Sequence, residues 1–292
     1  MKRLVACTST GCLEYAPERY RNLGIDIIRI HLFFKGKEYL EGLNLDPVDL
    51  YNELETLKNP KDNLPHTDMP TVDELKSFYQ SAIDRGYEEV IIVCISSALG
   101  GTYNLVKLVG EDFKDKLKIT VIDSKITCFG EGLLAVNIQN MVNEGIPTDK
   151  ILEEINWQIE RQQFIGVDGK LDYLIYNGRL KGGKALMGKM LNICPLIHFN
   201  NGEIVTLKTV RTPKKALHAT CEEVKRVLDG YSPDDYVMWH VYTGPSLLNE
   251  LLEIEKEYGI KCNHEDVIMS PVSGCHNGPW LAGYGISFIK KD

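Results

Sequence analysis

Small polar side chains follow an apolar run at Cys94–Tyr103, and their types and spacing suit the binding of an anion. Ser96, Ser97 and Thr102 are the hydroxyl donors of this segment. Gly101 lets the backbone approach a ligand closely. In open parallel sheets, ligands bind beyond the carboxyl ends of the strands, where the next helix offers unpaired N–H groups. The segment therefore predicts a ligand-binding turn, although an ordinary capped helix start has the same pattern.

Two other apolar runs end in the same way. Ile119–Ile122 is followed by Asp123 and Ser124, and Leu4–Ala6 runs into Thr8–Gly11. Because the carboxyl ends of neighbouring parallel strands meet at one edge of the sheet, we expect these polar residues to lie close together. The three strand ends predict one shared polar crevice.

A histidine near the end of the sequence is the most notable ionisable residue. Gly274 and Gly278 flank His276, which predicts a tight loop, and an imidazole can hydrogen-bond a carboxylate. A structural histidine is the simpler interpretation of the residue by itself. His276 also permits a hydrolase or transferase, with Ser97 as nucleophile and Asp123 as the residue that orients the base. The Gly-x-Ser-x-Gly turn typical of such enzymes is missing around Ser97.

Composition limits the functional classes. The chain has 292 residues, 43% of them hydrophobic, a net charge of −8 and a pI near 5.5. This charge excludes nonspecific nucleic-acid binding, which needs a basic field. No signal-peptide core or membrane-length apolar run stands out, so we expect a cytoplasmic protein. Transient contact with an anionic membrane would need a basic patch. The candidates are Arg179, Lys181, Lys184 and Lys189, and then Lys208, Arg211, Lys214 and Lys215.

We expect neither a metal nor a cofactor. The eight cysteines are scattered without a Cys-x-x-Cys pair, which is not a zinc framework. Gly178–Lys184 matches the first positions of a phosphate-binding loop, but Ala185 stands where a Ser or Thr must bind magnesium.

The arrangement of apolar runs predicts an α/β fold with two domains and the ligand at their interface. Residues 1–160 alternate short strands with helical patterns, which is typical of a doubly wound parallel sheet. Residues 161–292 contain a hairpin around Asn200-Asn201-Gly202 and predict a second α/β domain with a mixed or antiparallel sheet. The expected strands are Arg3–Cys7, Asp26–Leu32, Val90–Ile95, Ile119–Ile122, Pro195–Phe199, Glu203–Leu207, Tyr236–Tyr242, Val267–Ser270 and Gly285–Ile289. The expected helices are Pro47–Leu57, Thr71–Arg85, Gly130–Glu144, Lys150–Gln163, Leu171–Tyr176, Pro213–Leu228 and Ser246–Tyr258.

The motifs stand in the order of a known family over nearly the whole chain. They are Thr8-Ser9-Thr10, His66-Thr67-Asp68-Met69-Pro70, Ile95–Tyr103, Val121-Ile122-Asp123-Ser124, Gly178-Arg179, Val210-Arg211-Thr212 and Gly274–Pro279. This pattern resembles the DegV family, whose members look like bacterial fatty-acid-binding proteins, the acyl-carrying B component of fatty acid kinase. The resemblance implies a carrier without catalysis of its own, which buries a long-chain fatty acid and presents its carboxylate to a separate ATP-binding kinase subunit.

The resemblance also implies roles for individual residues. It places His276 across the crevice from Thr67 and Ser97, where these residues grip the carboxylate. It also implies that the domain of residues 161–292 holds the acyl tail. The full set expected to bind the carboxylate is Thr67, Ser96, Ser97, Gly101 and His276. The set expected to make secondary ligand contacts, or to contact phosphate or the partner, is Arg179, Arg211, Asp123, Ser124 and Thr102. Guanidinium groups suit both a phosphate and an acidic surface.

Five positions depart from the family pattern. Thr8 replaces an aspartate, Asp68 and Met69 replace a Ser-Gln pair, and Gly100 and Cys128 each replace a serine. An extra acid at Asp68 would repel an anionic ligand if it pointed inward, but an exposed aspartate that faces solvent or caps the next helix is the commoner case. The sequence does not determine the length or unsaturation of the acyl chain, or the identity of a kinase partner. A small-molecule hydrolase or transferase that uses Ser97 and His276 is the alternative function.

Overall fold

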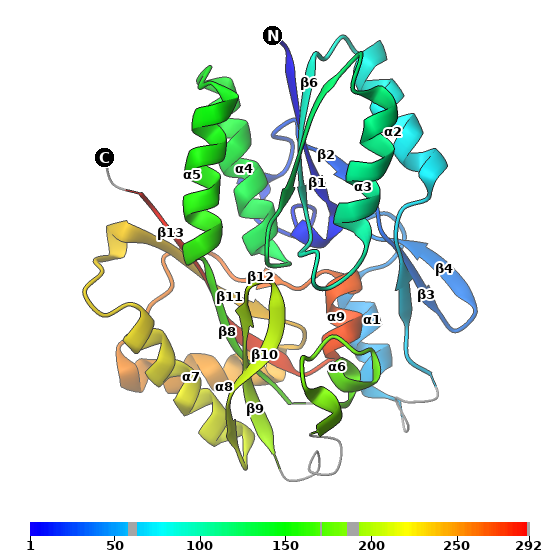
Figure 1. Ribbon diagram of the computed structural model, residues 1–292. Coiled ribbons are helices and arrows are strands. Elements are labelled where there is room, and N and C mark those ends of the chain that lie inside the picture. The colour runs from blue at the N-terminus through cyan, green and yellow to red at the C-terminus, as the bar shows by residue number, and fades with distance from the viewer. Residues whose placement is uncertain (58–62, 170, 186–192, 291–292) are drawn as a thin grey trace.

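The chain forms three β-sheets, which a computed structural model describes for residues 1–57, 63–169, 171–185 and 193–290 (Figure 1). The first sheet is fully parallel, with the strand order β2-β1-β6-β7. Its strands are β1 (Arg3–Thr8), β2 (Asp26–Ile28), β6 (Glu89–Cys94) and β7 (Lys118–Asp123). All six residues of β6 are buried, as expected for a central parallel strand covered on both faces.

Alternate residues of the central strands belong to two different cores. Leu4 and Val90 pack with α2 (Val72–Asp84) and α3 (Thr102–Gly110), whereas Val5 packs with α4 (Phe129–Asn143). Figure 1 shows α2 and α3 on one side of the sheet and α4 on the other. Side chains on a strand alternate between its faces, so this division follows from the period of two.

The second sheet is mixed, with the order β10-β9-β8-β13-β11-β12, and only β11 and β12 run parallel. Its strands are β8 (Gln163–Asp168), β9 (Cys194–Asn200), β10 (Glu203–Val210), β11 (Tyr236–Tyr242), β12 (Val267–Ile268) and β13 (Leu281–Phe288). Helices α7 (Pro213–Val227) and α8 (Pro245–Tyr258) pack on one face. The predicted β9–β10 hairpin is confirmed. Asn201 and Gly202 both have positive φ, as a tight two-residue hairpin turn requires.

Helix α4 lies between the two large sheets. Its residues Phe129 and Leu133 share one apolar cluster with Val5 of the first sheet and with Trp239 and Leu281 of the second. The α/β class, with a parallel and a mixed sheet, is therefore as predicted. The division at residue 160 stays a prediction, since α5 (Thr148–Arg161) leads directly into β8 and the apolar cluster spans both sheets.

A third sheet was not predicted, and the expected single strand Asp26–Leu32 is wrong. That segment divides into β2 and β3 (His31–Phe34), because the chain leaves the first sheet at Ile30, whose N–H is bonded to the Ser9 hydroxyl. Strand β3 then pairs antiparallel with β4 (Lys37–Leu40) and β5 (His66–Asp68), and α1 (Pro47–Glu55) follows β4.

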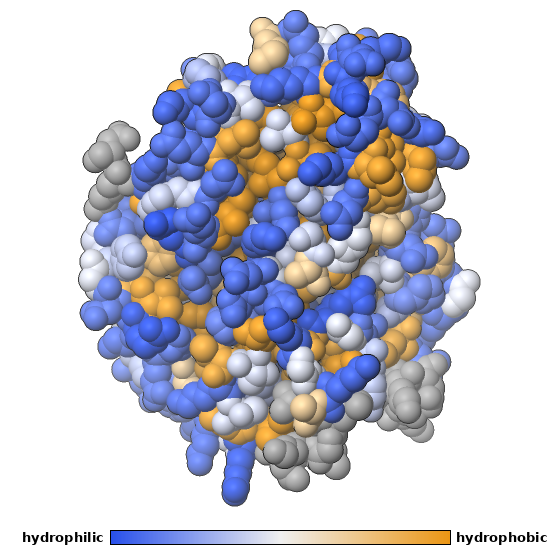
Figure 2. Space-filling view, in the orientation of Figure 1, coloured by the Kyte–Doolittle hydropathy of each residue, from blue (hydrophilic) through white to orange (hydrophobic). Residues whose placement is uncertain are grey.

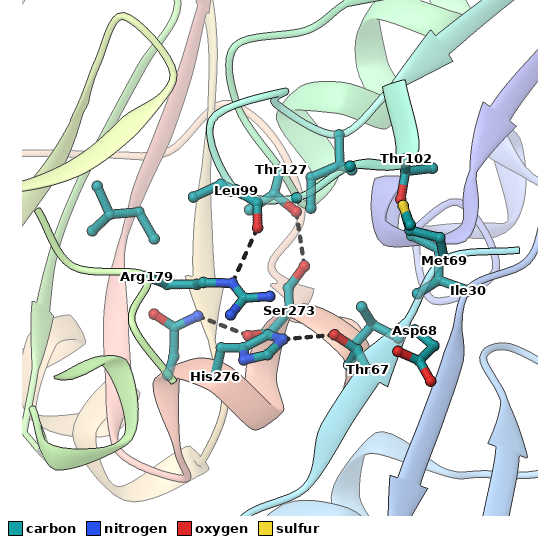
Figure 3. A pocket seen from close by; sticks show the side chains of 16 residues that line it. Ile30, Thr67, Asp68, Met69, Leu99, Thr102, Thr127, Arg179, Ser273 and His276 are labelled. Carbon is teal, nitrogen blue, oxygen red and sulfur yellow. Dashed lines mark hydrogen bonds between the residues drawn. The ribbon is translucent and has the colours of Figure 1, made fainter. Parts of the chain in front are cut away.

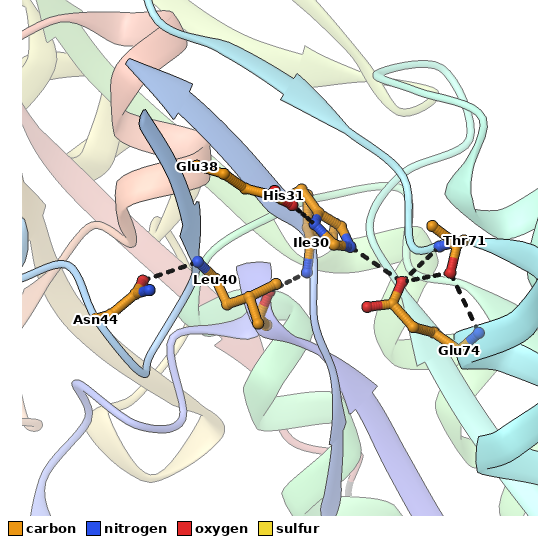
Figure 4. A network of polar contacts seen from close by, with 8 residues as sticks. Ile30, His31, Glu38, Leu40, Asn44, Thr71 and Glu74 are labelled. Carbon is orange, nitrogen blue, oxygen red and sulfur yellow. Dashed lines mark hydrogen bonds and ion pairs between the residues drawn. The ribbon is translucent and has the colours of Figure 1, made fainter. Parts of the chain in front are cut away.

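His31 ties this small sheet to α2. Its Nδ1 lies 2.6 Å from Glu38 Oε1, and its Nε2 lies 3.0 Å from Glu74 Oε2 (Figure 4). Burial alone lowers the pKa of His31, but the two carboxylates outweigh burial and raise it. Glu74 also completes a capping box with Thr71 at the start of α2. This network fixes the position of β5, which carries Thr67.

Three further elements differ from expectation. His276 lies on a short helix, α9 (Pro271–Asn277), rather than on a tight loop, because Ser270 caps a helix that begins with proline. Strand β13 begins at Leu281 rather than Gly285, and β8 was not assigned from the sequence. The short α6 (Asp172–Tyr176) matches the prediction to one residue.

A buried histidine of the second sheet forms an ionic network with two carboxylates beside the sheet. His240 Nδ1 lies 2.6 Å from Asp266 Oδ1, and its Nε2 lies 2.8 Å from Glu255 Oε2. Burial lowers the pKa of His240, but the hydrogen bonds to Asp266, Cys262 and Glu255 outweigh it and raise the pKa to about 12. The imidazole is therefore charged in the folded protein at neutral pH.

Apolar residues come to the surface in islands between hydrophilic ones on the face shown in Figure 2, as is normal for folded proteins. Among the described residues, none of the helices combines the length and the apolar composition that crossing a membrane requires.

Candidate functional site

A cavity of about 240 Å³ lies where α9, β5 and the turn after β6 meet (Figure 3). Its wall combines polar and apolar side chains from both halves of the chain. They are Ile30, Thr67, Asp68, Met69, Ile95, Leu99, Gly100, Gly101, Thr102, Thr127, Arg179, Ile204, Val272, Ser273, His276 and Asn277. The structure thus brings together Thr67, Gly101, Thr102, Arg179 and His276 of the residues predicted from the sequence.

His276 and Thr67 form the polar centre of the cavity. Thr67 Oγ1 lies 3.0 Å from His276 Nε2, and no described residue is bonded to the buried Nδ1. Burial, and secondly the charge of Arg179, lower the pKa of His276 to about 3, so the imidazole is neutral at physiological pH. A neutral imidazole carries one N–H. If the Thr67 hydroxyl donates to Nε2, the proton resides on Nδ1, which is then a donor without a protein acceptor.

Arg179 supplies the positive charge. Its Nε donates to the Leu99 carbonyl at 3.0 Å and its Nη1 donates to the Asn177 carbonyl at 2.6 Å. Figure 3 shows the guanidinium beside His276 and below Leu99. Two backbone carbonyls therefore hold the side chain in place. The remaining guanidinium N–H groups and the fixed charge favour an anionic group in the cavity.

Three of the five positions that depart from the family pattern, Asp68, Met69 and Gly100, line this cavity. A Cβ atom on Gly101 would lie 2.6 Å from Met69 Sδ, so Met69 fills the space above this glycine. A Cβ atom on Gly100, in contrast, would meet nothing within 4 Å. Asp68 is exposed, and Figure 3 shows its carboxylate pointing away from His276. The rim is thus acidic, while the interior beside His276 carries the charge of Arg179.

Helix α9 is held by a buried acid from the other half of the chain. The carboxylate of Glu41 accepts a hydrogen bond of 2.7 Å from Val272 N, in the first turn of α9. Burial raises the pKa of Glu41 to about 7. This contact fixes the helix that carries His276 against the segment after β4.

The other predicted hydroxyls are bonded within the protein and do not line the cavity. Ser96 is fully buried, and its Oγ donates to the Gly202 carbonyl at the tip of the β9–β10 hairpin, at 2.8 Å. The Ser124 hydroxyl donates to the Ile126 carbonyl at 2.9 Å. Ser97 donates both its N–H and its hydroxyl to Asp123. Ser97 is therefore bonded to Asp123 and His276 to Thr67, so the nucleophile–base hydrogen bond of a hydrolase is not formed between Ser97 and His276.

The carboxyl end of β1 is also occupied by protein groups. Thr8 and Thr10 donate to the carboxyl group of Glu131 in α4, with 2.8 Å for the Thr10 bond. Burial raises the pKa of Glu131 well above its ordinary value, against the effect of these hydrogen bonds. Where the family pattern has an acid at position 8, this chain thus has a hydroxyl that bonds to an acid from the facing helix.

Arg211 lies apart from the cavity, exposed after the end of β10. Of the basic residues considered for membrane contact, Lys181 forms an ion pair with Glu203 at 2.5 Å and Lys208 with Glu222 at 3.7 Å. Lys189 lies outside the described residues. In the part of the chain that the structure describes, no three His, Cys, Asp or Glu side chains gather as a metal ion would need.

A second, narrow cavity of about 20 Å³ adjoins the first. Both cavities are lined by Thr127, Ile204 and Asn277. The remaining wall is almost entirely apolar, and comprises Ile126, Cys128, Gly130, Phe164, Ile197, Phe199, Trp239, Val241, Met269, Leu281 and Gly285. Sequence reasoning did not identify this wall, because apolar residues that line a cavity have the same pattern as core residues.

The chain is similar to known proteins over nearly its whole length. A family model described as "Uncharacterised protein, DegV family" matches residues 5–290. A DegV domain-containing protein of Listeria innocua is 30% identical over 286 residues, with 94% of this chain and 95% of the relative covered. A crystal structure described as a fatty acid binding DegV family protein of Streptococcus agalactiae has a TM-score of 0.87 and 29% identity, covering 99% of this chain and 100% of that one.

A more distant structure has the same fold. DegV of Bacillus subtilis, described as a fatty acid binding protein, has a TM-score of 0.82 and 24% identity, with 99% of this chain and 100% of that chain covered. The family match over nearly all residues and the close structural agreement lead to one conclusion. The chain belongs to the DegV family.

Proposed function

We propose that this protein binds a long-chain fatty acid, with the carboxylate beside Thr67 and His276 and the tail in the adjoining apolar cavity. One observation carries the proposal. The neutral His276 has an Nδ1 without a described partner, and it lies beside the fixed charge of Arg179 in a cavity that adjoins an apolar one. A carboxylate cannot be buried without hydrogen bonds, and this group of residues would provide them.

The acyl tail would provide most of the binding free energy. Each buried methylene contributes about 0.8 kcal/mol, so a chain of ordinary length gains far more from burial than its carboxylate contributes. The apolar cavity is narrow in this structure, and Phe199 on the β9–β10 hairpin is only partly buried. Binding would therefore displace the hairpin side chains that fill the channel.

The second part of the proposal is that this protein acts together with a separate kinase subunit. The carboxylate would be presented at the cavity mouth to a separate ATP-binding kinase subunit, in which a carboxylate oxygen attacks the γ-phosphorus of ATP and ADP leaves. Arg179 at the cavity and Arg211 on the exposed surface are the residues proposed to contact the phosphate or the partner. The relative of S. agalactiae supports the fatty acid; the kinase subunit rests on the family resemblance of the motifs.

The first test is native mass spectrometry of the purified protein, followed by extraction and identification of any small molecule. A stoichiometric fatty acid is the expected result. A protein that carries none and takes up none when fatty acids are added would refute the proposal.

Variants then test the head group. Thr67→Val keeps the shape of the side chain but removes the hydroxyl that holds the proton of His276 on Nδ1. We expect weaker binding by about tenfold, because the hydrogen bond from Nδ1–H to the carboxylate is then no longer favoured. Ser97→Ala is the matched control, since its hydroxyl is bonded to Asp123 and not to the cavity. Equal loss in both variants would contradict the assignment. Acyl phosphate formation from ATP, measured with the kinase subunit and each variant, tests the presentation step.

A further inference from the structure

The apolar cavity contains one polar group without a partner. Trp239 of β11 is 1% exposed and lines this cavity, and no acceptor among the described residues is bonded to its indole Nε1–H. A buried indole N–H normally finds an acceptor, and leaving it unpaired is unfavourable. An alkyl tail has no atom that accepts this hydrogen bond.

The other polar side chains of the cavity differ from Trp239. Thr127 Oγ1 lies 2.7 Å from the Ser273 hydroxyl, and the Asn277 amide nitrogen donates to the Ser273 carbonyl at 2.8 Å. Both residues lie where the two cavities join. Protein groups therefore satisfy these side chains in the absence of a ligand, and the unsatisfied donor lies deeper along the wall.

Two neighbours hold the indole in place, and neither offers its Nε1–H a hydrogen-bond acceptor. Gly285 of β13 lies against it, and a Cβ atom there would be 2.7 Å from Nε1. Phe129 packs edge-on, with 5.2 Å between the ring centroids, and so fixes the plane of the indole. Most of the remaining wall is aliphatic or aromatic, so a lone water would lack the two to four polar partners it needs.

From this geometry we infer that the preferred ligand is an oxygenated acyl chain, whose carbonyl or hydroxyl oxygen accepts the hydrogen bond of Trp239. The inference rests on the proposed function, because it assumes that a fatty acid tail enters this cavity. It adds a second point of polar recognition, remote from the carboxylate. The head group would be recognised by His276 and Thr67, and the position of the oxygen along the chain would be read by Trp239.

The test compares octadecanoic acid with a series of oxo-octadecanoic acids that carry the carbonyl at different carbons. Affinities are measured by calorimetry for the unmodified protein, for Trp239→Phe and for the control Trp280→Phe, which alters a tryptophan that is 38% exposed. We expect one oxo isomer to bind the unmodified protein about fivefold to tenfold more tightly than octadecanoic acid, as one net hydrogen bond provides. Trp239→Phe should abolish that preference, and the control should keep it.

A second readout needs no variant of Trp239. In protein labelled with ¹⁵N, the indole N–H resonance of Trp239, assigned with Trp157→Phe and Trp280→Phe, should move downfield with the preferred oxo isomer and not with octadecanoic acid. If octadecanoic acid binds at least as tightly as every oxo isomer, or if the preference survives in Trp239→Phe, the inference is wrong while the fatty-acid proposal stands. Failure of every acid to bind would refute both.

Discussion

Replacing Ser96 by alanine separates two roles for the most prominent hydroxyl of the sequence. In the structure, Ser96 Oγ donates to the buried Gly202 carbonyl at 2.8 Å and accepts from Ala98 N at 3.3 Å. Ser96→Ala would leave the Gly202 carbonyl buried and unpaired, which costs about 1–3 kcal/mol. We therefore expect the free energy of unfolding of the ligand-free protein to fall by that amount.

A role of Ser96 in ligand binding predicts the opposite effects on stability and on affinity. If the Ser96 hydroxyl bonded the ligand carboxylate, its removal would weaken fatty-acid binding by roughly tenfold or more and leave the ligand-free protein as stable as before. Urea unfolding followed by circular dichroism measures the stability, and calorimetry measures the affinity. Ser97→Ala is the control, because its partner Asp123 keeps an ion pair of 2.7 Å with Lys125. Unchanged stability together with weaker binding in Ser96→Ala would refute the role in fixing the hairpin.

Three further changes follow from the structure. Gly100→Ser adds a hydroxyl at a position where a Cβ atom would meet nothing within 4 Å. Calorimetry should show that fatty-acid binding becomes about tenfold tighter, and weaker binding would contradict free space beside Gly100. Burial raises the pKa of Glu41 to about 7, so its contribution to stability is fully present below pH 4.5 and is lost as the pH rises to 7. In urea unfolding, Glu41→Gln should therefore gain stability relative to the unmodified protein between pH 5 and pH 8, and a constant difference between the two proteins would refute this. The pKa of His240 is raised, so the stability that its charged form contributes is fully present below pH 6.5 and declines above it. In thermal unfolding, His240→Gln should therefore lose more stability at pH 6 than at pH 9, and the reverse order would exclude a charged imidazole.

The strand-end pattern predicted the parallel sheet and the general place of the cavity, since both follow from local signals. The turn after β6 contributes Gly101 and Thr102 to the cavity wall, and the segment after β7 contributes Thr127, whereas Thr8 to Gly11 after β1 do not line it. Ser96 and Ser97 have the same residue types but bond to protein groups. A sequence gives the type of a side chain and its approximate place. Which neighbour its hydroxyl meets depends on contacts between distant segments.

Long-range contacts also explain the missed elements. Strand β3 is only four residues long, and its partners β4 and β5 are three or four residues long, so their pairing depends on tertiary contacts such as that of His31 with Glu74. The importance of Trp239 had no local signal at all, because a tryptophan in an apolar strand is typical of any core. Its unpaired N–H becomes visible only when the strand is packed against α4 and β13.

The position of α4 between two sheets has a consequence for synthesis on the ribosome. Strand β13, the last of the described strands, lies between β8 and β11, so the second sheet cannot close until residues 281–288 have been made. At ordinary elongation rates, the apolar surface of α4 that packs against this sheet stays exposed for on the order of ten seconds before the sheet is complete. The nascent first half is therefore a natural substrate for chaperones, and a fragment ending after α5 should aggregate rather than fold by itself.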